Sequence, residues 1–185
     1  MNQVERKPKM NESLCSEFIR HLDRNGDLGC DAPPGHIENW ISDLRLPVDF
    51  SRFLLFSWPQ KDCKIADINI HSSASLYADE ATAPLLKDKF FNAGWATSGD
   101  WFVVDFSKKD CIPGFIAQCE WNPWLDKPIK PRKFFQPIAR SLDSLLFRIT
   151  EGLYVPADYY AAKDFNEFLA KEPQVEKSAS EPPAS

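Results

Sequence analysis

Oxygen-bearing side chains that are able to hold calcium gather in the run Asp23-Arg24-Asn25-Gly26-Asp27. A calcium loop of the EF-hand type needs glycine at its sixth position and a bidentate carboxylate at its twelfth. Counted from Asp23, those positions hold Leu28 and Pro34. We therefore interpret the run as the polar end of a helix and expect no calcium site.

Cysteine and histidine are the residues that would bind zinc or supply a nucleophile and its base. A structural zinc site needs four such ligands in close pairs, but no Cys-x-x-Cys pair is present, and the three histidines are isolated: His21, His36 and His71. We expect no metal site and no cofactor. A Cys–His pair assembled by the fold stays open, because one sequence does not exclude it.

Other catalytic signatures are missing from the chain. It has no nucleophile elbow, no phosphate-binding glycine loop and no His-Glu-x-x-His stretch, and it contains only seven glycines. We therefore expect a protein that is not an enzyme, with a cysteine-dependent hydrolase as the minority alternative.

Two groups of side chains are candidates for binding a protein partner. Trp121 and Trp124 lie near a predicted strand end, and tryptophan is enriched where interfaces are strongest, although it can equally close the end of a sheet. Asp79, Glu80 and Asp158 are candidate charge partners for a basic protein. Nothing in the sequence shows that these acids meet in space.

The chain is acidic, with a net charge of −5. Residues 1–10 carry +2 and residues 171–185 carry −1, which leaves −6 for residues 11–170. Such a body favours a basic protein partner over nucleic acid, although the acidity can also serve solubility alone. The basic cluster Lys127, Lys130, Arg132 and Lys133 is interpreted as a solvated loop, with binding of an acidic partner as the alternative.

Composition indicates a globular protein, because 43% of the residues are hydrophobic and 13% are aromatic. No apolar stretch is long enough for a membrane helix, and the first residues lack the apolar segment of a secretory signal. The cysteines, Cys15, Cys30, Cys63, Cys111 and Cys119, are odd in number and are expected to be free thiols. A cytoplasmic location follows as the expectation. Residues 1–10 and 171–185 are expected to be flexible or disordered.

The elements that must position these residues divide into three regions. Short helices are predicted in the first third: one begins at Asn11, a second carries Ile37 to Leu44, and a third opens at Pro47 with Phe50, Phe53 and Leu54 turned inward.

Alternating residues then predict strands, among them Ile68 to Ile70, a pair joined at Ser98-Gly99, and Phe115 to Trp121 after a turn at Lys109-Asp110. Residues 76–90 are ambiguous, with Leu86 and Phe90 fitting a helical face. A helix is expected from Pro137 to Gly152, and another near residues 156–170. The prediction is an α+β fold: an antiparallel-rich sheet of about four to six strands, flanked by N-terminal and C-terminal helices.

The run GDWFVVDFSKKDCIPGFIAQCEW, followed by PIARSLDSLL, resembles the SUKH superfamily, which includes fungal cell-wall-synthesis regulators and bacterial immunity proteins. The resemblance spans residues 46–150 and starts at Leu46-Pro47, before the helical Phe50. Its remaining matches are Gly99, Asp100, Phe102, Asp105, Trp121, Ile138, Ala139 and Ser141. The chain departs from the family in having Ala96-Thr97-Ser98 before Gly99 and Cys119-Glu120 before Trp121.

The resemblance implies a single SUKH-like domain over residues 11–170 that acts as a recognition platform. Bacterial members are similar to cytoplasmic antidotes that bind and block a toxin domain, often a nuclease. The leading hypothesis is thus a non-catalytic immunity protein that neutralises a cognate toxin by direct binding, the partner being a basic toxin domain. The alternative of a different class is a regulatory or scaffold module of the same fold.

Overall fold

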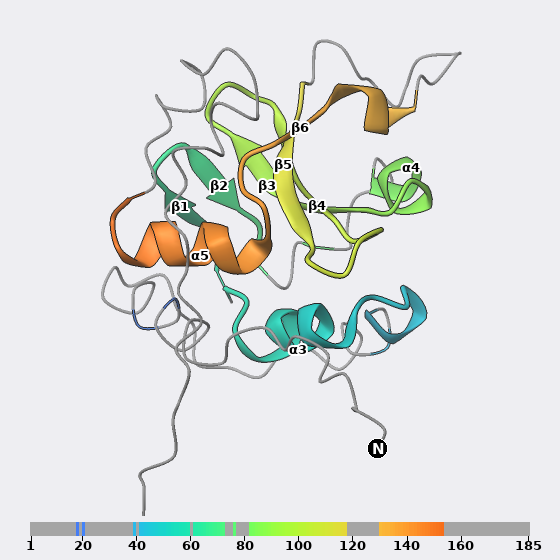
Figure 1. Cartoon of the computed structure of the whole chain (residues 1–185), viewed down its shortest axis with the longest axis horizontal. Helices are drawn as coiled ribbons and strands as arrows, with labels where there is room; N and C mark the ends of the chain where they lie inside the picture. Colours follow the sequence, from blue (N-terminus) through green and yellow to red (C-terminus); the bar gives the residue numbers. More distant parts are fainter. Residues whose placement is uncertain are drawn as a thin grey trace, which may run out of the picture.

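The computed structural model of the chain describes residues 18, 20, 39, 41–59, 61–72, 76, 82–117 and 130–153 (Figure 1). Its centre is a six-stranded antiparallel sheet in which every strand pairs with its neighbour in sequence, in the order β1-β2-β3-β4-β5-β6. Helices flank this sheet, so the predicted α+β class is confirmed. Within the described residues, no helix has the length and apolar character needed to cross a membrane.

The strands are short, and tight turns join β1 to β2 and β3 to β4. Their bounds are β1 Cys63–Ile65, β2 Ile68–Ile70, β3 Phe90–Ala96, β4 Trp101–Asp105, β5 Ile112–Ile116 and β6 Phe135–Pro137. The helices are α3 Val48–Phe56, α4 Thr82–Lys87, the 3-10 helix η1 Pro131–Phe134, and α5 Leu142–Thr150.

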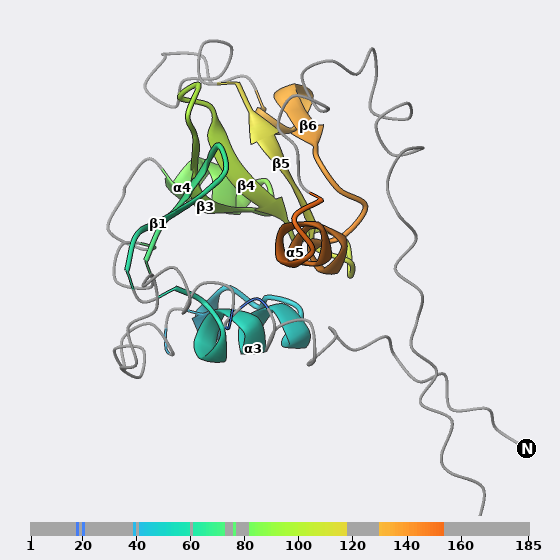
Figure 2. The ribbon, with the colours of Figure 1, turned by 90° about the vertical axis from the view of Figure 1, so that its left-hand side faces the viewer.

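One face of the sheet, here called the near face, packs against α3 and α5 in a single hydrophobic core. As predicted, α3 begins after Pro47 and buries Phe50, Phe53 and Leu54. Phe50 meets Phe91 of β3 edge to face, with ring centroids 5.4 Å apart. From α5, four aliphatic side chains enter the same core: Leu142, Leu145, Leu146 and Ile149. Figure 2 shows α3 and α5 at the same end of the molecule.

The other face, here called the far face, has a smaller core on its β3–β6 side. Leu85 of α4 is fully buried there with Phe90, Val103 and Ile116. The first residues of β3 explain this arrangement, because Phe90 points to the far face and Phe91 to the near face. Residues 82–90 are thus not one helical surface. Helix α4 ends at Lys87, and Phe90 begins a strand.

Two predicted turns are confirmed, whereas the predicted positions of two prolines are wrong. The chain turns at Ser98-Gly99, where Gly99 has φ of 94° and donates its N–H to the Ala96 carbonyl at 2.9 Å. It turns again at Lys109-Asp110. Pro113, expected beside that turn, instead lies within β5, which starts at Ile112 rather than Phe115.

Pro137 was expected in the first turn of the C-terminal helix but lies in β6, where it pairs with Gly114. The helix α5 starts later because Ser141 provides the cap: its hydroxyl accepts the Ser144 N–H at 3.1 Å. Gly152 ends the helix as predicted, with φ of 66° and its N–H donated to the Ile149 carbonyl.

Candidate partner-binding surface

A register-paired row of side chains crosses the far face from one edge of the sheet to the other. Residues directly opposite each other in antiparallel strands point to the same side of the sheet. The pairings give the row, from β1 to β6, as Lys64, Asn69, Trp95, Trp101, Ile116 and Phe135. Burial varies along the row: Lys64 and Trp95 are exposed, Asn69, Trp101 and Phe135 are half-buried, and Ile116 is fully buried in the core that Leu85 of α4 joins.

Trp95 stands where the covered and uncovered halves of the far face meet. The Trp95 side chain is 39% exposed, although the neighbouring residues Gly94 and Ala96 are buried. The ring of His71 packs edge to face against it, with centroids 4.9 Å apart, and Asn69 lies opposite on β2. We call the group Lys64, Asn69, His71 and Trp95 the Trp95 surface.

The turns at this end of the sheet are locked together and carry carboxylates. Thr97 donates its backbone N–H and its hydroxyl to the carbonyl of Asp67, at 2.7 and 3.0 Å, and so joins the β3–β4 turn to the β1–β2 turn. Ser98 donates its hydroxyl to the carboxylate of Asp100 at 3.0 Å. Asp67 and Asp100 are each half-buried beside a fixed backbone. The result is an ordered, partly acidic edge next to an exposed tryptophan.

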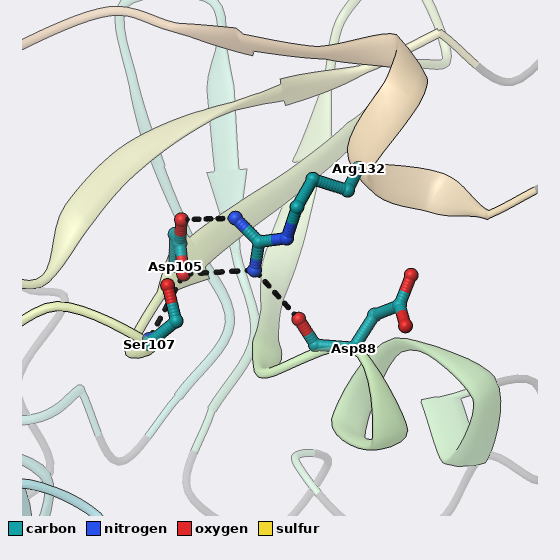
Figure 3. A network of polar contacts seen from close by, with 4 residues as sticks. All are labelled: Asp88, Asp105, Ser107 and Arg132. Atoms are coloured by element: carbon teal, nitrogen blue, oxygen red, sulfur yellow. Dashed lines mark hydrogen bonds and ion pairs between the residues drawn. The ribbon is translucent and has the colours of Figure 1, made fainter.

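At the opposite end of the strands, Arg132 bridges three segments (Figure 3). Its guanidinium donates two hydrogen bonds to Asp105 at the end of β4, at 2.7 and 3.2 Å, and one to the backbone carbonyl of Asp88 at 2.7 Å. The guanidinium carbon also lies 4.5 Å from the centre of the Phe90 ring. Arg132 therefore fastens η1 to both the sheet and the end of α4.

Electrostatics favours this ion pair strongly. Burial by itself would raise the pKa of Asp105, but the hydrogen bonds from Arg132 and Ser107 outweigh it and hold that pKa below its ordinary value of 3.8. The hydrogen bond to Asp105 raises the pKa of Arg132 in return. Only 3% of the Asp105 side chain is exposed, against 43% for Arg132. The charge on Asp105 thus serves the fold by holding η1.

The described thiols are poorly placed for catalysis. Cys63 and Cys111 are both buried thiols outside any disulfide. Burial raises the pKa of the Cys111 thiol to about 12, and the charge of nearby Asp105 adds to the effect, so the reactive thiolate is scarce at neutral pH. Cys63 pairs with Ile70 of β2 and points into the near-face core. His71, which follows Ile70, packs on Trp95 on the far face. Cys63 and His71 thus project from opposite faces of the sheet.

Most of the site residues predicted from the sequence fall outside the part of the chain that the structure describes. Asp79, Glu80, Trp121, Trp124 and Asp158 all lie outside the described residues, as do the calcium-like run and the tails at 1–10 and 171–185. Of the basic cluster, Lys127 lies outside as well. Arg132 is not the freely solvated loop residue that was expected, because it makes the ion pair with Asp105. In the part of the chain that is described, no group of three or more metal-ligating side chains gathers.

Sequence reasoning did not single out Trp95 or the partner of Arg132. A signal for Trp95 is present in retrospect, since a large aromatic at an outward position of an alternating strand is a candidate contact.

Comparisons of the chain with protein-family models, with curated proteins and with solved structures find no match.

Proposed function

We propose that this protein is a non-catalytic binding domain whose Trp95 surface docks a protein partner. The proposal rests on the indole of Trp95, which is 39% exposed on an otherwise buried strand and is held in place by His71. A rigid aromatic that is already ordered loses little conformational freedom on binding, and tryptophan is the side chain most enriched at energetic centres of interfaces.

The role we propose is immunity: the protein neutralises a cognate bacterial toxin, with a nuclease as the expected target class, by direct binding. The resemblance to the SUKH superfamily supports this role, and so do the unreactive Cys111 thiol and the α+β sheet. Asp67 and Asp100 beside the Trp95 surface suit a basic toxin domain, because complementary charge accelerates encounter and improves selectivity. A cytoplasmic location is part of the proposal, supported by the free thiols Cys63 and Cys111.

Substituting Trp95 tests where the partner binds. The tagged protein would be used to capture its partner from its own cells, and the affinity of the purified pair would be measured by calorimetry. We expect Trp95→Ala to weaken binding by about 2 kcal/mol, or roughly 30-fold, as for an interface hot spot. Val48→Ala is the matched control, since Val48 of α3 is also an apolar side chain and is 73% exposed. Equal affinity of the Trp95 variant and the wild type would contradict the proposed site.

Inhibition of the captured partner tests the role itself. An immunity protein should abolish the toxicity of the partner when the two are expressed together, and the Trp95→Ala variant should protect less. If the partner binds at the Trp95 surface but its activity is unchanged, the protein is instead a regulatory or scaffold module.

A further inference from the structure

The described residues carry a net positive charge within a chain that is acidic as a whole. The described residues include 14 Lys and Arg and 10 Asp and Glu, a net charge of +4, whereas the whole chain carries −5. The remaining residues therefore carry −9. Six of the positive charges of the described residues come from lysines around one feature of the fold.

Six exposed lysines from three separate segments lie around the Arg132 bridge. Lys87 and Lys89 flank Asp88, whose carbonyl accepts from Arg132 at 2.7 Å. Lys130 directly precedes η1, and Lys133 follows Arg132 within it. The β4–β5 turn reaches the same place, because Phe106 donates its N–H to the Lys89 carbonyl at 2.9 Å just before Lys108 and Lys109. We call these six lysines the basic rim.

The carboxylates at this end do little to neutralise the rim. Asp105 is buried and already committed to Arg132 and Ser107. One carboxylate oxygen of Asp88 is buried away from solvent. Asp110 is the exposed acid of the β4–β5 turn. Among the described residues Arg132 takes up the charge of Asp105, which leaves Asp88 and Asp110 as the acids beside these six lysines.

Two of the rim lysines are positioned by aromatic rings beneath them. The ammonium of Lys89 lies 5.6 Å from the centre of the Phe106 ring, and that of Lys133 lies 5.8 Å from the centre of the Phe134 ring. Such contacts lower the freedom of a long side chain while leaving its charged end in water. The rim is therefore a partly ordered positive surface on a folded support.

We propose that the basic rim is a second docking surface, which binds an acidic segment of a protein partner. Nucleic acid is the less suited polyanion, because its charge continues beyond the rim and would meet the repulsion of a chain with net charge −5. A short acidic segment avoids this, since screening confines the field of the rim to about 8–10 Å at physiological salt. Lys87, Lys89, Lys108 and Lys109 lie beside the Phe90–Asp105 end of β3 and β4, away from Trp95, and none of the rim lysines belongs to the Trp95 surface.

Fluorescence anisotropy of a dye-labelled oligo-glutamate peptide tests the rim in the full chain. We expect binding that weakens as salt rises, and an affinity about tenfold lower in the Lys108→Glu, Lys109→Glu variant, from several weak charge contacts acting together. The matched control is Arg52→Glu, Lys61→Glu, which changes the net charge equally at two exposed positions away from the rim. That control should bind within about twofold of wild type. Circular dichroism would verify that both variants are folded.

Three outcomes would overturn the proposal. The peptide fails to bind the wild-type chain, or both charge-reversal variants lose affinity equally, or a single-stranded oligothymidylate of the same formal charge binds more tightly than the peptide. Because Trp95→Ala should leave the peptide affinity unchanged, failure of the rim and failure of the Trp95 surface are distinguishable.

Discussion

Replacing Gly94 with alanine is expected to lower the free energy of unfolding by about 4 kcal/mol, a large fraction of the stability of a domain this size. The register of β3 against β4 shifts between Asn92 and Gly94, and on its other side Gly94 pairs with Ile70 of β2. A Cβ atom at residue 94 would clash with the backbone carbonyl of Asn69, because it would lie 1.9 Å from the carbonyl oxygen. The φ of 153° at Gly94 adds strain for any other residue. Neither the strand pairing nor φ can change without disturbing the core.

Chemical denaturation of the variant measures this loss, and Gly152→Ala is its matched control. Gly152 also has a positive φ, of 66°, but a Cβ there would meet nothing within 4 Å. Its substitution should cost about 1 kcal/mol, the ordinary penalty for a left-handed residue. If the two substitutions destabilise equally, the close approach of β3 to β2 is not what requires glycine at residue 94.

Replacing Arg132 with methionine is expected to destabilise the protein by about 2 kcal/mol at neutral pH. The substitution keeps an aliphatic chain over Phe90 but leaves the buried carboxylate of Asp105 without its counter-ion. Removing one partner of a fully buried pair costs about 3–5 kcal/mol, and the 43% exposure of Arg132 reduces that figure through solvent screening. Lys130→Met, which removes an exposed charge from the residue just before the same helix, should change stability by no more than about 0.5 kcal/mol.

The pH dependence of that loss identifies its cause. In the wild type the pKa of Asp105 is lowered, so its contribution is present above the unfolded pKa of 3.8 and is lost as the pH falls through the folded pKa. Without Arg132, the pKa of Asp105 loses the hydrogen bond and the charge that lower it and is therefore higher than in the wild type, so the variant stops burying a charge at a higher pH. The stability gap between the two proteins should therefore narrow in acid. A gap that stays constant from neutral to acidic pH would mean that lost packing, not charge, causes the destabilisation.

The parts of the fold that follow local rules were predictable from sequence. Helix α3 follows from Pro47 and the spacing of Phe50, Phe53 and Leu54, and all three side chains are buried as expected. The hairpin turn at Gly99 follows from its tolerance of positive φ. In each case, adjacent residues contain all the information that the structure uses.

The errors concern prolines and residues whose partners are distant in sequence. Pro113 and Pro137 look like turn and helix-start residues, yet they lie in β5 and β6, where the pairing with other strands determines their conformation. Ser141, an ordinary polar residue in the sequence, sets the start of α5 through its cap. Local pattern does not reveal which of two compatible roles a residue takes.

The candidate sites were harder to predict than the fold for the same reason. Trp95 is one of six tryptophans, and only the register of β3 against β2 and β4 shows that it faces solvent beside His71. Arg132 finds Asp105 across 27 positions of sequence. The basic rim likewise joins three segments that the sequence keeps apart. The acidic and aromatic candidates chosen from sequence lie outside the described residues.

Hydroxyl-radical footprinting of the protein with and without its captured partner tests the central claim most directly. Oxidation of a side chain reports its exposure to solvent, and Trp95 is both reactive and 39% exposed in the free chain. We predict that the partner strongly suppresses oxidation of Trp95, while the exposed side chains of Val48 and Leu153 stay as reactive as before. A stable complex in which Trp95 is oxidised as fast as in the free protein would contradict a partner docked on this surface.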